Sequence, residues 1–155
     1  MRPDVALDEL LDPEGTVNFD LDGDGTMEAW PWVKPDTGFL VWDPGRKGEV
    51  TSGRQLFGSY TFQIPWNDGY EPLALLDANT DGNLSGAELD GIRAWFDRDS
   101  DGVSSKSEVV DLAELGIAAI GVNADHSKSG PVCEHGLRLE SGKALVTWDW
   151  LAKPK

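Results

Sequence analysis

The sequence contains one cysteine, two histidines and only 13 Lys and Arg residues against 28 Asp and Glu residues, in a chain of 155. The lone Cys133 excludes an internal disulfide. His126 and His135 do not stand at zinc-site spacing from this cysteine, so we expect no zinc site and place both histidines in loops. With a formal net charge of −15 and no basic cluster, the chain is poorly suited to bind nucleic acid or anionic membranes.

Long hydrophobic runs are also absent. No apolar stretch is long enough to span a bilayer, and the N-terminus lacks the basic and then apolar pattern of a secretion signal. There is no Ser/His/Asp arrangement, phosphate-binding glycine loop or nucleophile elbow, which favours a protein without enzymatic activity. The 39% hydrophobic residues, including seven Trp, suffice for the core of one domain over residues 1–155.

What the sequence does contain is a tandem acidic repeat, DANTDGNLSGAE at 77–88 and DRDSDGVSSKSE at 97–108. Both segments match the 12-residue EF-hand calcium loop, with side-chain oxygens at positions 1, 3, 5 and 12, glycine at position 6, and a carbonyl ligand at position 7. Oxygen ligands in this number suit Ca²⁺ better than zinc or magnesium. An ordinary acidic turn would not need a carboxylate six residues past its glycine. The predicted ligands are Asp77, Asn79, Asp81, Asn83, Ser85 and Glu88 in the first loop and Asp97, Asp99, Asp101, Val103, Ser105 and Glu108 in the second.

A third acidic segment, at 20–28, matches the same loop in part. Its position 12 is Pro31, which has no ligating side chain. Two interpretations stay open: an acidic turn that joins two strands, or a third calcium site completed by water, by Glu28 or by a remote oxygen such as that of Asp36. The sequence thus predicts two calcium sites and allows a third. The candidate ligands of the third are Asp20, Asp22, Asp24, Thr26 and Glu28.

A fourth segment, DPGRKGEVTSGR at 43–54, keeps only Asp43 and the central Gly48 of the template. Gly45 and Lys47 stand where oxygen ligands are needed, so we predict that no metal binds there. Our hypothesis is that the Lys47 ammonium lies near the vacant ion position and replaces the ion by a fixed charge.

Hydrophobic periodicity predicts the surrounding fold. Short apolar runs at 17–19, 39–42 and 60–66, separated by Gly, Pro and Asp, indicate strands. Between 72 and 117 the spacing becomes helical, with one helix over Leu89 to Phe96 and another from Val109 to Gly116. Because the two loops start 20 residues apart, the first helix must serve both of them.

The predicted fold class is therefore α+β, with a small antiparallel sheet and hairpins packed on a compact EF-hand-like loop-helix-loop-helix pair. We expect a strand-rich part at 17–70, the EF-hand pair at 71–122, and a loop and C-terminal hairpin at 123–155. The hairpin turn is predicted at Ser141-Gly142. A cluster of Trp30, Trp32 and Trp42 is expected in the core or on a ligand surface.

Four stretches, VNFDLDGDGTMEAWPWV, TGFLVWD, GRQLFG and LALLDANTDGNLSGAELDGIRAWFDRDSDGVSSKSEVVDLAELGIAAI, resemble an EF-hand-bearing region of large secreted bacterial proteins. Over about residues 17–122 the chain is similar to the calcium-dependent self-processing modules of RTX-type exoproteins, and more closely to uncharacterised bacterial EF-hand proteins. The resemblance implies calcium as cofactor, other domains of a larger secreted protein as partners, and an extracellular or cell-surface location. In that family the segment matching 43–55 is an acidic loop followed by Glu, whereas this chain has Gly45, Lys47 and Gln55.

Three functions follow from the sequence. The first is a calcium-binding module whose ions stabilise the fold of a secreted bacterial protein. The second is self-processing, because the self-processing relatives cleave an Asp-Pro bond and this chain has two, Asp12-Pro13 and Asp43-Pro44, which ordinary turns also explain. The third is a docking or adhesion module analogous to dockerins, which also carry two closely spaced calcium loop-helix repeats.

Overall fold

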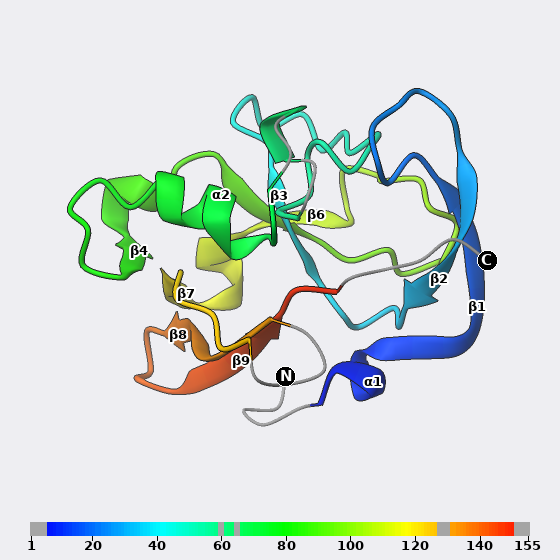
Figure 1. Cartoon of the computed structure of the whole chain (residues 1–155). Coiled ribbons are helices and arrows are strands. Elements are labelled where there is room, and N and C mark those ends of the chain that lie inside the picture. The colour runs from blue at the N-terminus through cyan, green and yellow to red at the C-terminus, as the bar shows by residue number, and fades with distance from the viewer. Residues whose placement is uncertain (1–5, 59–60, 64–65, 127–130, 151–155) are drawn as a thin grey trace.

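A computed structural model describes residues 6–58, 61–63, 66–126 and 131–150. Within these residues the chain is mostly β, with nine strands in three antiparallel sheets (Figure 1). The α-helices among them are short: α1 spans Leu7–Leu10 and α2 spans Tyr70–Leu75. The predicted α+β fold class with an EF-hand-like helix pair is therefore wrong.

The first sheet is a hairpin of β1 (Leu11–Phe19) and β2 (Glu28–Val33), and the acidic segment 20–28 is its loop. Phe19 pairs with Glu28, so the strands flank this loop directly. Val17 and Phe19 point inward and are buried, as the alternation of a half-buried strand requires. The register shifts between Asp12 and Thr16, which places a bulge near the start of β1.

The second sheet has the order β3 (Phe39–Trp42), β5 (Ile92–Trp95) and β6 (Val109–Asp111). The central strand β5 occupies the segment predicted as the helix Leu89 to Phe96. Ile92 and Ala94 pack in one core while Trp95 packs in another, so residues on both faces of the strand are buried. A strand buried on both faces produces a nearly continuous apolar run, which helical spacing can imitate.

The second predicted helix, from Val109, is also divided differently. Its first half is β6, and its second half is a 3-10 turn, η3 (Leu112–Leu115). Gly116 ends this turn in the left-handed region at φ 72°, so the predicted glycine stop is confirmed. A further 3-10 turn, η2 (Gly86–Leu89), forms the end of the first loop and contains its Glu88. The helix that precedes the first loop, α2, has Pro72 in its first turn.

The third sheet has the order β4 (Asn83–Ser85), β7 (Ile117–Gly121), β8 (Val132–Leu139) and β9 (Ala144–Trp148). The hairpin β8–β9 turns at Ser141-Gly142, with Gly142 at φ 92°, and confirms the predicted C-terminal hairpin. His135 lies on β8 rather than in a loop. The 3-10 turn η1 (Thr61–Gln63) stands where a strand was predicted at 60–66, of which residues 60, 64 and 65 lie outside the described residues.

Two hydrophobic cores lie on either side of β5. The first, which we call the aromatic core, is built on Phe19, Trp32 and Trp95, whose ring centroids lie 5.6 to 6.0 Å apart. The second, the aliphatic core, contains Leu84, Ile120 and Leu112. Trp30 and Trp32 are buried in the aromatic core and Trp42 packs against the aliphatic core, so these tryptophans form core rather than a ligand surface.

Candidate metal centre

Three groups of acidic side chains converge, and each comes from one of the acidic loops. Within each group, one carboxylate oxygen from every member lies within 4.8 Å of the others. Like charges this close repel one another unless a cation lies between them. The described residues thus include three acidic groups that are placed to hold a metal ion. Their members are Asp20, Asp22, Asp24 and Glu28 in the first, Asp77, Asp81 and Glu88 in the second, and Asp97, Asp99 and Glu108 in the third.

A common backbone arrangement brings these side chains together. The first aspartate of each loop accepts two hydrogen bonds from the loop backbone. Its Oδ1 accepts from the N–H of the residue four positions later, and its Oδ2 accepts from the N–H of the position-6 glycine. The N···O distances are 3.0 and 3.0 Å for Asp20, 3.3 and 2.9 Å for Asp77, and 3.2 and 2.9 Å for Asp97. The glycines adopt φ values of 90°, 86° and 70°, which side chains rarely tolerate. The glycine that the template requires at position 6 therefore closes each loop around its first carboxylate.

The 97–108 loop is built into the aromatic core. Asp97 is 1% exposed and Glu108 is 6% exposed. The Trp32 indole N–H donates to Asp97 Oδ2 at 2.7 Å, and the Trp95 indole N–H donates to Glu108 Oε2 at 3.3 Å. Burial raises the pKa of Asp97 to about 6, because desolvation disfavours the charged carboxylate. A bound cation would offset that cost.

The 77–88 loop lies at the edge of the aliphatic core. Its anchor is Leu84 on β4, which is fully buried. The Glu88 carboxylate folds back over the loop and accepts from Ser85 N at 3.3 Å and Asn79 N at 3.5 Å. In this loop the position-12 carboxylate is held by the loop's own exposed backbone and not by a core side chain.

The 20–28 loop gains its fourth carboxylate from Glu28. The Oε2 atom of Glu28 is buried and has no hydrogen-bond partner, although buried carboxylate oxygens are normally paired. Burial and the neighbouring carboxylates raise the pKa of Glu28. Pro31 pairs with Thr16 inside the hairpin, and Asp36 lines a groove beside α1 and β9, outside this group. Of the donors proposed to complete this site, the structure brings in Glu28.

Backbone N–H groups within each loop hold the position-5 carboxylates, including Asp101, which lies outside the converging groups. Asp101 Oδ1 accepts from Val103 N at 2.8 Å, and Asp81 Oδ1 accepts from Asn83 N at 2.9 Å. Asp24 Oδ1 likewise accepts from Thr26 N at 2.7 Å. The Ser105 hydroxyl contacts that of Ser107 at 3.1 Å. These bonds orient the position-5 carboxylates by the same turn in every loop.

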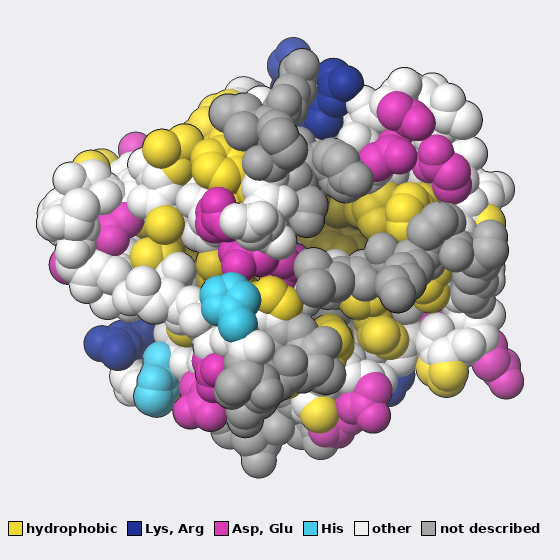
Figure 2. Space-filling view, viewed as in Figure 1, with side chains coloured by type: hydrophobic (Ala, Val, Ile, Leu, Met, Phe, Trp, Pro, Cys, Tyr) yellow, Lys and Arg dark blue, Asp and Glu magenta, His cyan; other side chains and the backbone are white. Residues whose placement is uncertain are grey.

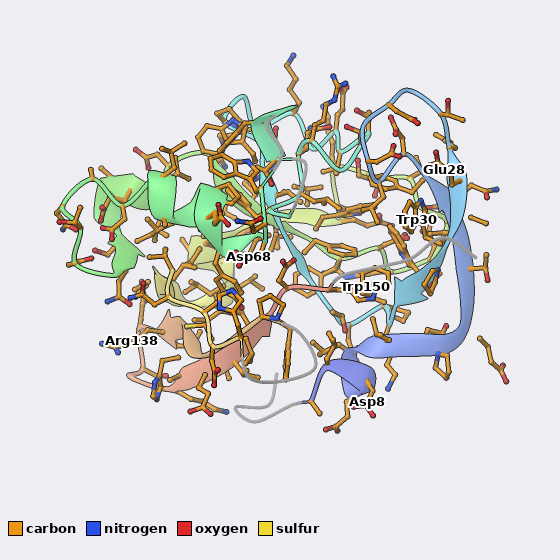
Figure 3. The ribbon with its side chains drawn as sticks, in the orientation of Figure 1. Asp8, Glu28, Trp30, Asp68, Arg138 and Trp150 are labelled. Carbon is orange, nitrogen blue, oxygen red and sulfur yellow. The ribbon has the colours of Figure 1, made fainter. Side chains whose placement is uncertain are left out.

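Two of these loops and the 43–54 segment meet at one end of the aromatic core. The Ser104 hydroxyl donates to the Gly48 carbonyl at 3.0 Å and accepts from Val50 N at 2.7 Å. Gly53 N donates to the Asp20 carbonyl at 2.8 Å. Figure 2 shows acidic side chains gathered at the upper right, at and above the position at which Figure 3 labels Glu28. The 77–88 loop lies at the opposite side of the molecule, around β4 (Figure 1).

The 43–54 segment corrects one hypothesis. The cation that contacts the Asp43 carboxylate is the guanidinium of Arg93, with Nη1 2.9 Å from Oδ2. Lys47 contributes its backbone N–H to Asp43 Oδ1 at 3.0 Å. Sequence reasoning missed Arg93 because it lies 50 residues away, and only the pairing of β3 with β5 brings it to Asp43.

Outside the acidic loops, titratable groups gather where β9 ends near α2. His126 Nε2 lies 2.7 Å from Asp68 Oδ2, and Asp149 Oδ2 accepts from Gly69 N at 2.9 Å. Burial raises the pKa of Asp149 to about 6.

No helix within the described part of the chain is long and apolar enough to cross a membrane.

Comparison with known proteins identifies a relative and a family. The chain is 36% identical over 107 residues to the iron-regulated protein FrpA of Neisseria meningitidis serogroup C. That match covers 66% of this chain and 10% of the relative, so the chain spans about a tenth of the length of FrpA. A family model described as the SPM domain matches residues 8–142, which include all three acidic groups. The match covers most of the chain, and the protein therefore belongs to the SPM domain family.

Proposed function

We propose that this chain is a calcium-binding module whose ions stabilise the fold of a secreted bacterial protein. The observation that carries the proposal is the convergence of carboxylates in three loops of one backbone form. The donors are oxygens alone, from carboxylates, amides and carbonyls, which is the set that calcium prefers. Two ions belong to the 77–88 and 97–108 loops, and the unpartnered Glu28 oxygen supports a third at 20–28.

The same geometry favours a stabilising role over a sensing one. Sensor proteins respond to calcium by opening a pair of helices. Among the described residues the segments that follow the loops are strands and 3-10 turns locked into two cores. Calcium bound only by the native state stabilises that state by mass action. Its expected effect is thus a higher melting temperature with little change in exposed surface.

We also propose an extracellular or cell-surface location and other domains of a larger secreted protein as partners. The support is the resemblance to secreted bacterial proteins and the much greater length of FrpA. Extracellular calcium modules bind with dissociation constants of about 10⁻⁴ to 10⁻³ M and are still filled outside cells. The analogy to dockerins rested on loop-helix repeats, and the strand at β5 removes it.

Calorimetric titration with calcium tests the proposal. The wild-type chain should bind three ions, and Glu28→Gln, Glu88→Gln and Glu108→Gln should each bind one fewer, because each removes a converging carboxylate. Glu140→Gln, at an exposed position of the β8–β9 turn, is the matched control. A stoichiometry of two in both wild type and Glu28→Gln would remove the third site. The absence of heat, together with an unchanged melting temperature, would contradict the proposal as a whole.

Self-processing is a second candidate, at Asp12-Pro13. In this reaction the aspartate carboxylate attacks its own main-chain carbonyl, a cyclic anhydride forms, and the proline nitrogen leaves with a proton. Asp43 is unsuited, because two backbone N–H groups and Arg93 hold its carboxylate in place. Asp12 lies at the β1 bulge, where Glu14 N donates to its Oδ1 at 3.1 Å.

Mass spectrometry after incubation with calcium tests this candidate. Cleavage should separate residues 1–12 from the rest, and Asp12→Ala should abolish it, because alanine has no carboxylate to attack. An intact mass after prolonged incubation with saturating calcium would rule it out.

A further inference from the structure

The 43–54 loop has the backbone of the three acidic loops without their ligands. Asp43 accepts from Lys47 N on Oδ1 and from Gly48 N on Oδ2, both at 3.0 Å, so the donors lie four and five residues later as in the other loops. Gly48 adopts φ 70°. The fourth position is also left-handed in all four loops, with φ values of 72° at Gly23, 54° at Arg46, 55° at Thr80 and 56° at Ser100.

Three oxygens surround the guanidinium of Arg93, which reaches this loop from β5. Its Nη1 lies 2.9 Å from Asp43 Oδ2, its Nε lies 2.9 Å from Asp111 Oδ1, and its Nη2 lies 3.0 Å from the Val109 carbonyl oxygen. Two carboxylates and a carbonyl are the donor types that surround a calcium ion. Asp43 is 5% exposed and the Arg93 side chain is 13% exposed, so the pair is largely shielded from water.

Two ionised carboxylates, those of Asp43 and Asp111, contact the Arg93 guanidinium. Although burial opposes it, hydrogen bonds from Gly48 and Arg93 lower the pKa of Asp43. Hydrogen bonds from Arg46 and Arg93 lower the pKa of Asp111. Both carboxylates therefore stay ionised at neutral pH and present negative charge to the guanidinium, as ligands present it to a metal ion.

We propose that Arg93 fills the cation position of a fourth metal-type loop, so that this loop is closed by a covalently attached charge at every calcium concentration. The comparison with metal loops rests on the proposed calcium function, whereas the role of Arg93 as the closing charge does not. The proposal explains Gly45 and Lys47: once a guanidinium supplies the charge, carboxylates at positions 3 and 5 have no ion to bind. It also gives β3, β5 and β6 a contact that chelators cannot remove.

A pair of variants tests whether Arg93 stands in the place of an ion. Gly45→Asp/Lys47→Asp places carboxylates at positions 3 and 5 and keeps Arg93, and the triple variant adds Arg93→Met. A groove of about 430 Å³, lined in part by Asp43, Arg93 and Asp111, gives an ion access to the loop. In a titration with Ca²⁺, or with Tb³⁺ as a probe, the triple variant should bind one ion more than the double variant.

Two results would overturn the proposal. If the double variant already binds the additional ion, Arg93 does not occupy the cation position. If neither variant binds it, the loop is not a metal-type loop. Both results differ from a failure of the calcium function itself, in which the wild-type chain would bind no ion.

Stability in a chelator tests the closing charge independently of any ion. Arg93→Met should raise the unfolding equilibrium constant about tenfold or more at fixed urea, because it leaves the buried Asp43 without a cation, whereas Asp111 keeps its ion pair with Arg46. The increase should be equal in calcium and in chelator. Arg138→Met is the matched control, since Arg138 is exposed on β8 and points away from the molecule (Figure 3). An Arg93→Met effect no larger than that of Arg138→Met would overturn the proposal.

A second variant covers the case in which Arg93→Met does not fold. Asp43→Asn/Arg93→Met removes both charges and leaves an amide oxygen for the loop N–H groups. It should unfold at a higher urea concentration than Arg93→Met, since the unpaired buried carboxylate is gone. An equal or lower midpoint would mean that the two side chains do not act as a charge pair.

Discussion

The 77–88 and 97–108 loops share one template position by position, but they are attached to the molecule differently. In the 97–108 loop, two core tryptophans donate to the carboxylates of positions 1 and 12, Asp97 and Glu108. In the 77–88 loop the loop backbone itself holds Glu88. The same ligand pattern thus serves as part of a core in one place and as a surface loop in the other. The affinity of a loop for its ion and the contribution of that loop to the stability of the fold can therefore be measured as separate quantities.

The largest expected effect is the difference in stability between variants of the first aspartate in each loop, Asp97→Ala and Asp77→Ala. Asp97→Ala leaves the buried Trp32 N–H and Gly102 N–H without an acceptor, in addition to removing a ligand. In calcium it should lower the free energy of unfolding by about 3 kcal/mol or more, against about 1 kcal/mol for Asp77→Ala. Urea unfolding measures both values. Equal losses would show that the attachment to the aromatic core contributes nothing.

Terbium luminescence reports the same contrast optically. Trp32 and Trp95 contact ligands of the 97–108 loop, so tryptophan excitation should transfer energy chiefly to Tb³⁺ in that loop. Glu108→Gln should remove most of the sensitised emission at sub-saturating Tb³⁺, whereas Glu88→Gln should leave most of it. Emission lost equally in both variants would mean that the two sites lie in similar aromatic surroundings.

Asp149 shows what burial does to a carboxylate without an acidic loop. Its pKa is raised to about 6 from an ordinary 3.8, so the folded state favours the protonated form, and that stabilisation is lost as pH rises from about 4 to 6. Asp149→Asn keeps an acceptor for Gly69 N and should be about 1–2 kcal/mol more stable than wild type at pH 7.5.

The same variant should match wild type near pH 4, where Asp149 is itself uncharged. Urea unfolding over this pH range in a chelator makes the measurement. The charged groups beside Asp149 are Asp68 and His126, and both are unchanged in the variant. A constant difference at every pH would contradict the assignment of the effect to the Asp149 charge.

The smallest expected effect tests whether the two loops differ because of the residue at position 3 or because of their attachment to the core. Asn79→Asp gives the first loop the carboxylate that Asp99 supplies in the second, and keeps an acceptor for Asp81 N. In chelator the free energy of unfolding should change by about 0.5 kcal/mol or less, because the position is exposed. The stabilisation that calcium gives through this loop should stay below the stabilisation that it gives through the 97–108 loop. Thermal unfolding with and without calcium compares the two: the Glu108→Gln background reports on the 77–88 loop, and the Glu88→Gln background reports on the 97–108 loop. Equal stabilisation would assign the difference to position 3 alone.

The tight turns of the acidic loops could be predicted from the sequence because their chemistry is local. A glycine at position 6, the carboxylates around it and the glycine stop at 116 act within a few residues, and the structure places them accordingly. The hairpin at Ser141-Gly142 is local in the same sense. Turns that depend on short-range backbone constraints can therefore be predicted without knowledge of the fold.

What could not be predicted depends on contacts across the chain. The spacing of Leu89, Ile92 and Trp95 suits a helix, and only the presence of two separate cores makes the segment a strand. The pairing of Asp43 with Arg93 and of Asp97 with Trp32 joins residues 50 and 65 positions apart. No periodicity in a single sequence encodes such pairs.

The placement of β5 between two cores also fixes the alignment of its neighbours. In most sheets a slip by one residue turns an apolar face toward water, which is costly but leaves the strand intact. On β5 such a slip would exchange the places of Ala94 and Trp95 between the two cores and turn the Arg93 guanidinium away from Asp43. A volume mismatch on one side, a void on the other and a stranded charge would arise together. The native register of the strand is therefore favoured by three separate contributions to its stability.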